Sequence, residues 1–153
     1  MSNFNIFDSK YLYLFMPDGI EFIHNILENI GINSFKSLKA RDKGLIVIKK
    51  LFDLELIEIF HWGKYDNIIR PLNLNKEQTI NFIETVWFDN ADFSDFSSMP
   101  MFKYKEWYLK GLNDMGLTHT TDWKKFVQEK IVDLEKWIEE NKLKNTAYNN
   151  GYK

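Results

Sequence analysis

The segment from Phe60 to Pro71, FHWGKYDNIIRP, gathers residue types that could do chemistry: a histidine, aromatic rings, a glycine turn and an arginine. A histidine acts as a general base, or activates a nucleophile, when a second group orients its ring or shares its proton. We find no such partner for His61 within the segment. We therefore interpret the segment as a turn between two strands, in which Lys64 and Arg70 are the groups able to contact phosphate or a partner.

The other two histidines, His24 and His119, also lack the neighbours that chemistry requires. Neither is spaced from another histidine as metal ligands usually are. His24 has Glu21 and Glu28 at helical spacings, which we interpret as a solvated helix face with a favourable charge pair. We interpret His119 as a turn residue. The sequence therefore predicts no metal site.

Motifs for nucleophiles and cofactors are missing from the sequence as well. There is no cysteine, so thiolate chemistry and disulfides are excluded. No G-x-S-x-G motif is present, and the seven glycines occur singly, so no loop is suited to cradle a phosphate. We expect no catalytic residue, no cofactor and no enzymatic activity. The alternative left open is a pair of carboxylates that only the fold could bring together.

Charge is distributed unevenly along the chain, although the net charge is only -2. Between Lys36 and Lys50 there are six basic residues and one acid, whereas between Lys76 and Lys103 there are five acids and no basic residue. A basic second helix followed by a basic turn is typical of nucleic-acid binding, because its cations can meet phosphates. The residues of this alternative are Lys36, Lys39, Arg41, Lys43, Lys64 and Arg70. The competing interpretation is that the lysines only solvate the outer face of an amphipathic helix.

The acidic stretch favours a protein partner. Its core, WFDNADFSDF, alternates Asp with Phe where neither helical nor strand periodicity accounts for the rings. Exposed rings supply contact area and carboxylates steer a partner, as at many protein interfaces. We predict partner binding by Glu84, Trp87, Phe88, Asp89, Asp92, Phe93, Asp95 and Phe96. The alternative is that the three phenylalanines pack into the core beneath a solvated loop.

Hydrophobic periodicity predicts the elements that must position these residues. Spacings of three and four indicate helices over 18–30, from 34 or 37 to 52, over 76–88 with Asn75 as its cap, and from Thr120 or Thr121 to 141. For 103–117 we favour a helix closed by Gly116, and the alternative left open is a strand up to Tyr108 followed by a turn. The period changes to two in 56–62 and in 67–73, which predicts a β-hairpin. Residues 1–16 are expected to form a short strand or a packed arm, 89–102 a loop, and 142–153 a frayed tail.

Together these elements predict an α+β fold that is mostly helical. A winged-helix-like core over 18–90, made of helices plus a two-stranded β-hairpin, is followed by an acidic loop and a C-terminal helical extension over 91–141. The chain has 153 residues, 44% of them hydrophobic, so we expect a single domain over 1–153 with a sizeable core. No signal peptide or membrane span is recognisable, so we expect a cytoplasmic protein with no membrane contact.

Part of the chain resembles known families. The run from Arg41 through KGLIVIKKLFDLELIEIFHWG to IIRPLNLNKEQTINFIETVWFD resembles small bacterial proteins with a winged-helix-like core. A small, cysteine-free, acidic and aromatic-rich chain with an Asp/Phe loop is similar to the immunity proteins of bacterial polymorphic-toxin and contact-dependent growth inhibition systems. This resemblance implies binding without turnover: the chain would neutralise a cognate toxin domain, such as a nuclease, by covering its active site or substrate cleft.

Overall fold

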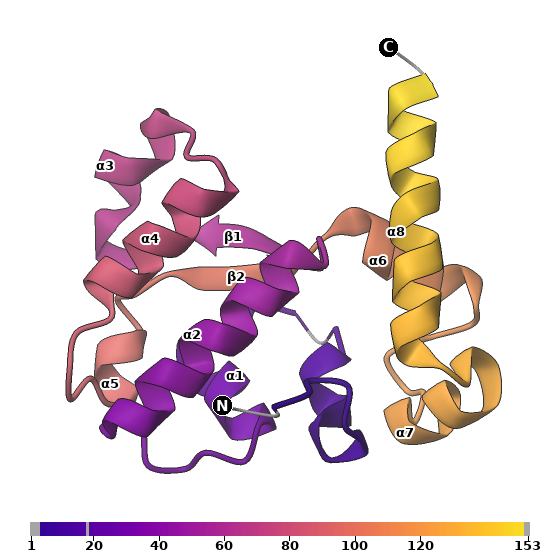
Figure 1. Cartoon of the computed structure of the whole chain (residues 1–153), viewed down its shortest axis with the longest axis horizontal. Helices are drawn as coiled ribbons and strands as arrows, with labels where there is room; N and C mark the ends of the chain where they lie inside the picture. Colours follow the sequence, from indigo (N-terminus) through magenta and orange to yellow (C-terminus); the bar gives the residue numbers. More distant parts are fainter. Residues whose placement is uncertain (1–3, 18, 152–153) are drawn as a thin grey trace.

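The computed structural model describes residues 4–17 and 19–151, with side chains up to residue 144. Over this range the fold is mostly helical with one small antiparallel sheet, which confirms the predicted α+β class. The helices are α1 (Ile23–Asn29), α2 (Leu38–Asp53), α3 (Asp66–Ile69), α4 (Lys76–Val86), α5 (Phe93–Phe96), α6 (Glu106–Asp114), α7 (Trp123–Phe126) and α8 (Leu134–Gly151). The strands are β1 (Ile57–His61) and β2 (Met101–Tyr104) (Figure 1). In the described residues, no helix has the length and apolar run needed to cross a membrane.

Helices α2 and α4 begin where local capping chemistry predicts. Ser37 accepts a hydrogen bond from the Ala40 N–H at 3.0 Å, which satisfies a free donor in the first turn of α2. Asn75 and Gln78 form a reciprocal capping box at the start of α4, with bonds of 2.9 and 3.0 Å. The first predicted helix is shorter than expected, because α1 begins only at Ile23.

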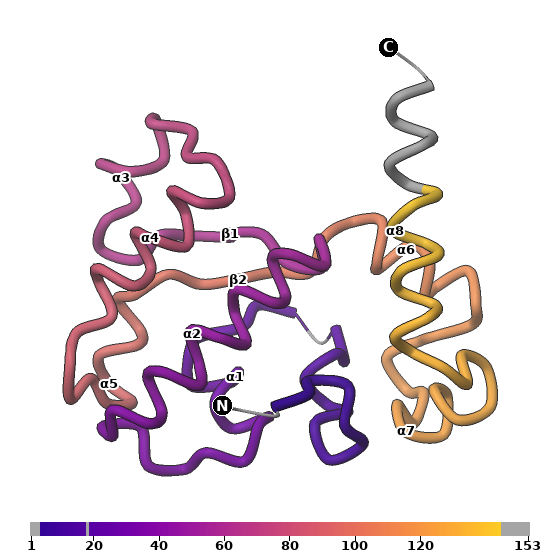
Figure 2. The backbone as a smooth tube through the Cα atoms, viewed as in Figure 1, coloured from indigo at the N-terminus to yellow at the C-terminus, as the bar shows by residue number. Residues whose placement is uncertain are grey.

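The predicted hairpin is wrong. β1 pairs with β2, some forty residues away, and segment 67–73 forms the end of α3 and the 3₁₀ turn Arg70–Leu72. Pro71 lies near the start of that turn, where a missing N–H costs nothing. The first half of β2 was predicted as loop, and its second half as helix or, in the alternative, as a strand up to Tyr108; the structure has the strand, which ends at Tyr104. Figure 2 follows the backbone from β1 through α3, α4 and α5 and back beside β1 as β2. The winged-helix likeness therefore lacks its wing and stays a prediction.

The N-terminal residues form a packed arm, as one of the two predictions for them proposed. The arm contains a 3₁₀ helix, Ser9–Phe15, and three aromatic side chains from later in the chain donate to its carbonyl groups. Tyr104 donates to Leu14, Tyr108 donates to Phe15 at 2.6 Å, and the Trp123 indole donates to Leu12 at 2.9 Å. Burial raises the pKa of Tyr108 well above its usual value, so its hydroxyl stays a donor.

The last predicted helix is interrupted. α7 is followed by a π-helical turn, Val127–Ile131, and then by Val132, whose φ of 71° no helix contains. Asp122 caps α7 in place of the predicted threonines, and Asp133 accepts from the Lys136 N–H in the first turn of α8. The apolar residues at helical spacing along this segment are nevertheless buried: Trp123, Phe126, Val127, Ile131, Leu134 and Ile138. α8 packs on α6 at one edge of the molecule (Figure 1). The predicted frayed tail, 142–153, falls on the end of α8 and on residues outside the described range.

Candidate partner-binding surface

The structure divides the predicted partner-binding rings into two groups. Trp87 and Phe96 are 1% and 0% exposed, so they belong to the core, and their assignment to the surface was wrong. Phe88 and Phe93 are 47% and 59% exposed, as the interface prediction requires. The core has room for the Trp87 ring because Gly44 lies beneath it: a Cβ at Gly44 would be 2.4 Å from Cη2 of Trp87. Trp87 and Phe96 therefore anchor the loop in the core, whereas Phe88 and Phe93 are exposed at its surface.

The acidic residues of the loop also divide by role. Asp92 and Asp95 form a capping box: Asp92 accepts from the Phe93 N–H at 2.9 Å, and Asp95 accepts from the Asp92 N–H at 2.8 Å. This box starts α5 and so positions Phe96 in the core and Phe93 at the surface. Asp92 also lies 3.8 Å from the Lys36 ammonium. Asp92 and Asp95 therefore have a structural role, because changing both would disturb α5, the helix that carries Phe93.

Phe93 rests on a cluster of rings that runs from the core to the surface. We call Phe22, His24, Phe35, Phe93 and Phe96 the aromatic cluster. The ring centres of Phe93 and His24 are 4.5 Å apart, and those of Phe35 and Phe96 are 5.8 Å apart. His24 Nδ1 donates to Glu28 at 3.1 Å, which fixes its ring. The charge pair with Glu28 was predicted, but the ring is packed instead of solvated, and Glu21 is buried elsewhere beside β2. The exposed ring of Phe93 is thus held in place.

A hollow of about 230 Å³ separates Phe88 from the start of α2. Phe35 lines it as well, so the hollow borders the aromatic cluster. Arg41 lies along its wall, where its guanidinium donates to the backbone oxygens of Trp87 and Glu84, both at 2.7 Å. These oxygens belong to the last turn of α4, which lacks intrahelical donors and carries the negative end of the helix dipole. Arg41 is therefore a cap of α4.

Charges of both signs lie beside the hollow. Glu84 and Asp89 are exposed, and in the described part of the chain neither has an ion-pair partner. Of the nearby cations, Lys36 faces Asp92, whereas Arg41 donates to neutral carbonyl groups and keeps its positive charge. Glu84 and Asp89 are therefore the carboxylates of this surface that are free to meet a cationic contact of a partner.

The six predicted nucleic-acid-binding cations are mostly in use within the fold. Arg41 and Arg70 hold backbone oxygens, Lys36 faces a carboxylate, and the ammonium groups of Lys43 and Lys64 lie 5.2 and 5.3 Å from the ring centres of Phe4 and Tyr65. Lys39 is exposed on α2. With the wing also missing, no observation on these residues favours nucleic acid over a protein partner.

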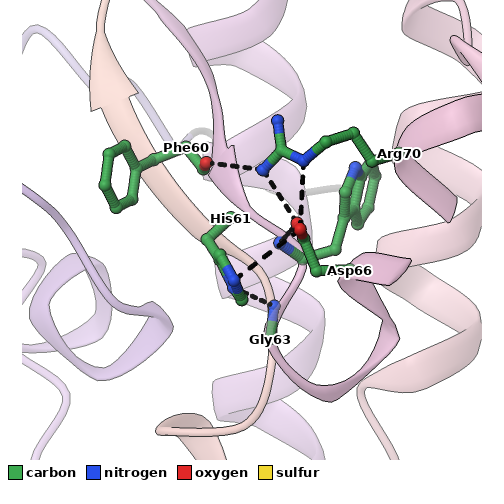
Figure 3. A network of polar contacts seen from close by, with 6 residues as sticks. Phe60, His61, Gly63, Asp66 and Arg70 are labelled. Carbon is green, nitrogen blue, oxygen red and sulfur yellow. Dashed lines mark hydrogen bonds and ion pairs between the residues drawn. The ribbon is translucent and has the colours of Figure 1, made fainter. Parts of the chain in front are cut away.

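Asp66 joins the residues of the FHWGKYDNIIRP segment (Figure 3). It accepts from the Arg70 guanidinium at 2.8 and 3.0 Å and from the Trp62 N–H at 2.9 Å. His61 Nε2 lies 3.7 Å from its Oδ2. The expectation that His61 has no partner in the segment was therefore wrong. The helical turn after β1 brings Asp66, five residues further along the chain, close to the imidazole ring.

The contacts of His61, Asp66 and Arg70 hold the turn that follows β1 in place, and we call these three residues the lock. The Gly63 N–H donates to His61 Nδ1 at 2.9 Å, so the neutral ring carries its proton on Nε2, toward Asp66 (Figure 3). Arg70 also donates to the Phe60 backbone oxygen at 3.0 Å. Within the described residues, the two ring nitrogens of His61 therefore face groups of the turn itself, Gly63 and Asp66. In the described residues, no group of three His, Asp or Glu side chains is placed to hold a metal ion.

The lock should make the stability of the fold sensitive to acid. Hydrogen bonds from Arg70 and then from the Trp62 N–H lower the pKa of Asp66 to about 2. A carboxylate with a lowered pKa stabilises the fold above its unfolded pKa of about 4, and this stabilisation is lost as the pH falls toward 2. Asp66→Asn should therefore unfold at lower urea than the wild type at neutral pH, and the difference should shrink below about pH 4. A difference that is the same at pH 7 and pH 2.5 would contradict this role.

Comparison with protein-family models, with curated proteins and with solved structures gave no match. The interpretation of this surface therefore rests on its geometry and charge.

Proposed function

We propose that this chain is a non-catalytic, cytoplasmic immunity protein that binds and neutralises a cognate toxin domain. The observation that carries the proposal is the display of Phe88 and Phe93 beside two carboxylates, Glu84 and Asp89, that form no ion pair in the described chain. Large rings at a protein surface are the side chains that most often anchor an interface. The proposed partner-binding surface comprises Glu84, Phe88, Asp89 and Phe93, supported by the aromatic cluster.

The surface is suited to binding without large rearrangement. Phe93 packs against His24 with its ring tilted by 42°, and the Asp92–Asp95 box fixes the short helix that carries it. A ring that is already ordered loses little conformational entropy when a partner covers it. The unpaired carboxylates favour a partner whose contact region is cationic, such as the substrate cleft of a nuclease. Covering that cleft would block the toxin without any chemical step.

Charge on this surface should control how fast the partner binds. The double variant Glu84→Gln and Asp89→Asn removes two charges without changing shape, so association at low salt should slow by about tenfold, while dissociation changes little. The dependence of the association rate on salt should also flatten. Stopped-flow measurement with a toxin domain that binds this chain, isolated by pull-down from the native cell, provides the test.

The matched control changes two exposed glutamates on the C-terminal helical region, Glu129→Gln and Glu140→Gln. This variant carries the same net charge as the surface variant. If both variants slow association equally, net charge is responsible and the assignment of the surface fails. If neither does, the partner does not approach through these carboxylates.

A further inference from the structure

His24 packs directly against Phe93, the more exposed of the two rings on the proposed partner-binding surface. Its ring centre is 4.5 Å from that of Phe93 and 5.4 Å from that of Phe22. The ring centres of Phe35 and Phe96 are 6.3 and 6.4 Å away. The side chain of His24 is 15% exposed, so most of it is enclosed by these rings. A partner seated on Phe93 therefore lies next to the imidazole of His24.

The two ring nitrogens of His24 differ in their surroundings. Nδ1 donates to Glu28 Oε1 at 3.1 Å, so in the neutral ring Nε2 carries the lone pair. None of the described residues bonds to Nε2. Among these residues, no polar side-chain atom is buried without a hydrogen-bond partner. Nε2 therefore reaches solvent, from which it can take up a proton.

Other charged groups lie on the elements that pack against His24. The Asp92–Asp95 capping box of α5 is bound to backbone N–H groups, and Lys36 faces Asp92 at 3.8 Å. Glu21 is buried beside β2. Glu28 is the carboxylate in contact with the ring, and its side chain is half exposed. The positive charge of a protonated His24 would therefore be balanced chiefly by Glu28.

The free chain can hold His24 in either charge state. Histidines change charge between about pH 5 and pH 8. A protonated ring would gain the ion pair with Glu28 and would lie against the ring of Phe93, and aromatic rings attract cations at such distances. A partner on Phe93 changes this balance, because it removes water from around Nε2 and brings its own cationic groups close. Both effects disfavour the charged form of His24.

We propose that protonation of His24 weakens partner binding, so that acid releases the partner from this surface. The inference rests on the proposed function, from which it takes a partner with a cationic contact region. If the charged ring is favoured in the free chain and disfavoured in the complex, binding expels a proton, and affinity falls as the pH falls. Loss of one proton changes the affinity by about tenfold per pH unit at most, so binding should be about tenfold weaker at pH 5.5 than at pH 7.5.

The direct test is an NMR titration of the histidine ring protons, in the free chain and in its complex with the toxin domain isolated by pull-down. The titration midpoint of His24 is expected to be lower in the complex by about one pH unit or more. His119 is the internal control, because it is exposed in the turn before α7, and its midpoint should be the same in both. Titration calorimetry at the two pH values should show a smaller loss of affinity for His24→Gln than for the wild type.

Three results would overturn the proposal. The His24 ring could keep one charge state from pH 5 to pH 8 in the free chain, its midpoint could be unchanged or raised in the complex, or the wild type and His24→Gln could lose affinity equally. Failure of the proposed function is distinguishable. If a variant that lacks both surface rings, Phe88→Ala with Phe93→Ala, binds the toxin domain like the wild type, the surface itself is wrong and the role of His24 falls with it.

Discussion

Replacing Gly63 with alanine is expected to destabilise the fold by about 3 kcal/mol or more, because two independent costs coincide at this residue. The φ of Gly63 is 68°, which strains any residue that has a Cβ. A Cβ here would also lie 2.2 Å from the Ser98 oxygen and 2.4 Å from its carbonyl carbon. These are backbone atoms, and the same oxygen accepts from the Lys64 N–H at 3.0 Å, so it cannot move aside without losing that bond.

Gly116 provides the matched control for Gly63. Its φ of 107° is also positive, but a Cβ there would meet nothing within 4 Å. Gly116→Ala should therefore cost only the backbone strain, about 1 kcal/mol. Urea denaturation followed by tryptophan fluorescence measures both variants. Equal destabilisation of the two would contradict the close approach of the β1–α3 turn to Ser98.

The second large effect is expected on partner binding. Phe88→Ala and Phe93→Ala each remove an exposed ring from the proposed partner-binding surface, and anchor rings typically contribute about 2 kcal/mol or more. The double variant should therefore bind the toxin domain at least about a hundredfold more weakly. Because both rings are about half exposed, the urea midpoint of the double variant should stay close to that of the wild type.

Tyr13 is the control for these rings. It is 47% exposed, the same fraction as Phe88, but it lies on the N-terminal arm. Tyr13→Ala should leave the affinity for the toxin domain unchanged, as measured by titration calorimetry. A loss of affinity in Tyr13→Ala equal to that in the Phe88 and Phe93 variants would show that the interface is not confined to the proposed surface.

Local chemistry explains what the sequence predicts correctly. Ser37 and Asn75 cap α2 and α4 through bonds to residues three positions along, so their role is visible in the sequence. The Asp92–Asp95 pair has the same spacing as a capping box and could have been identified as one. The alternation of Asp with Phe instead favoured an interface, and for that reason both residues were assigned to partner binding. The consequence is practical, since substitutions at Asp92 and Asp95 would disturb α5 and so would not separate binding from folding.

Contacts between distant segments explain what the sequence does not predict. Period-two patterning marks β1 as a strand, but its partner β2 lies some forty residues away, and a nearby apolar run was the more obvious choice. Similarly, Trp87 and Phe88 are neighbours of similar character, and only the space over Gly44 decides which ring is buried. The pairing of His61 with Asp66 depends on α3 replacing the expected strand.

The most direct test of the proposed function is inhibition of the toxin domain captured with this chain from the native cell, measured in that domain's own activity assay against increasing amounts of the chain. The wild-type chain is expected to abolish that activity at a one-to-one ratio, and the Phe88→Ala, Phe93→Ala double variant is expected to leave it largely intact. Tyr13→Ala should inhibit like the wild type. Full activity in the presence of excess wild-type chain, or equal inhibition by the double variant, would contradict the account.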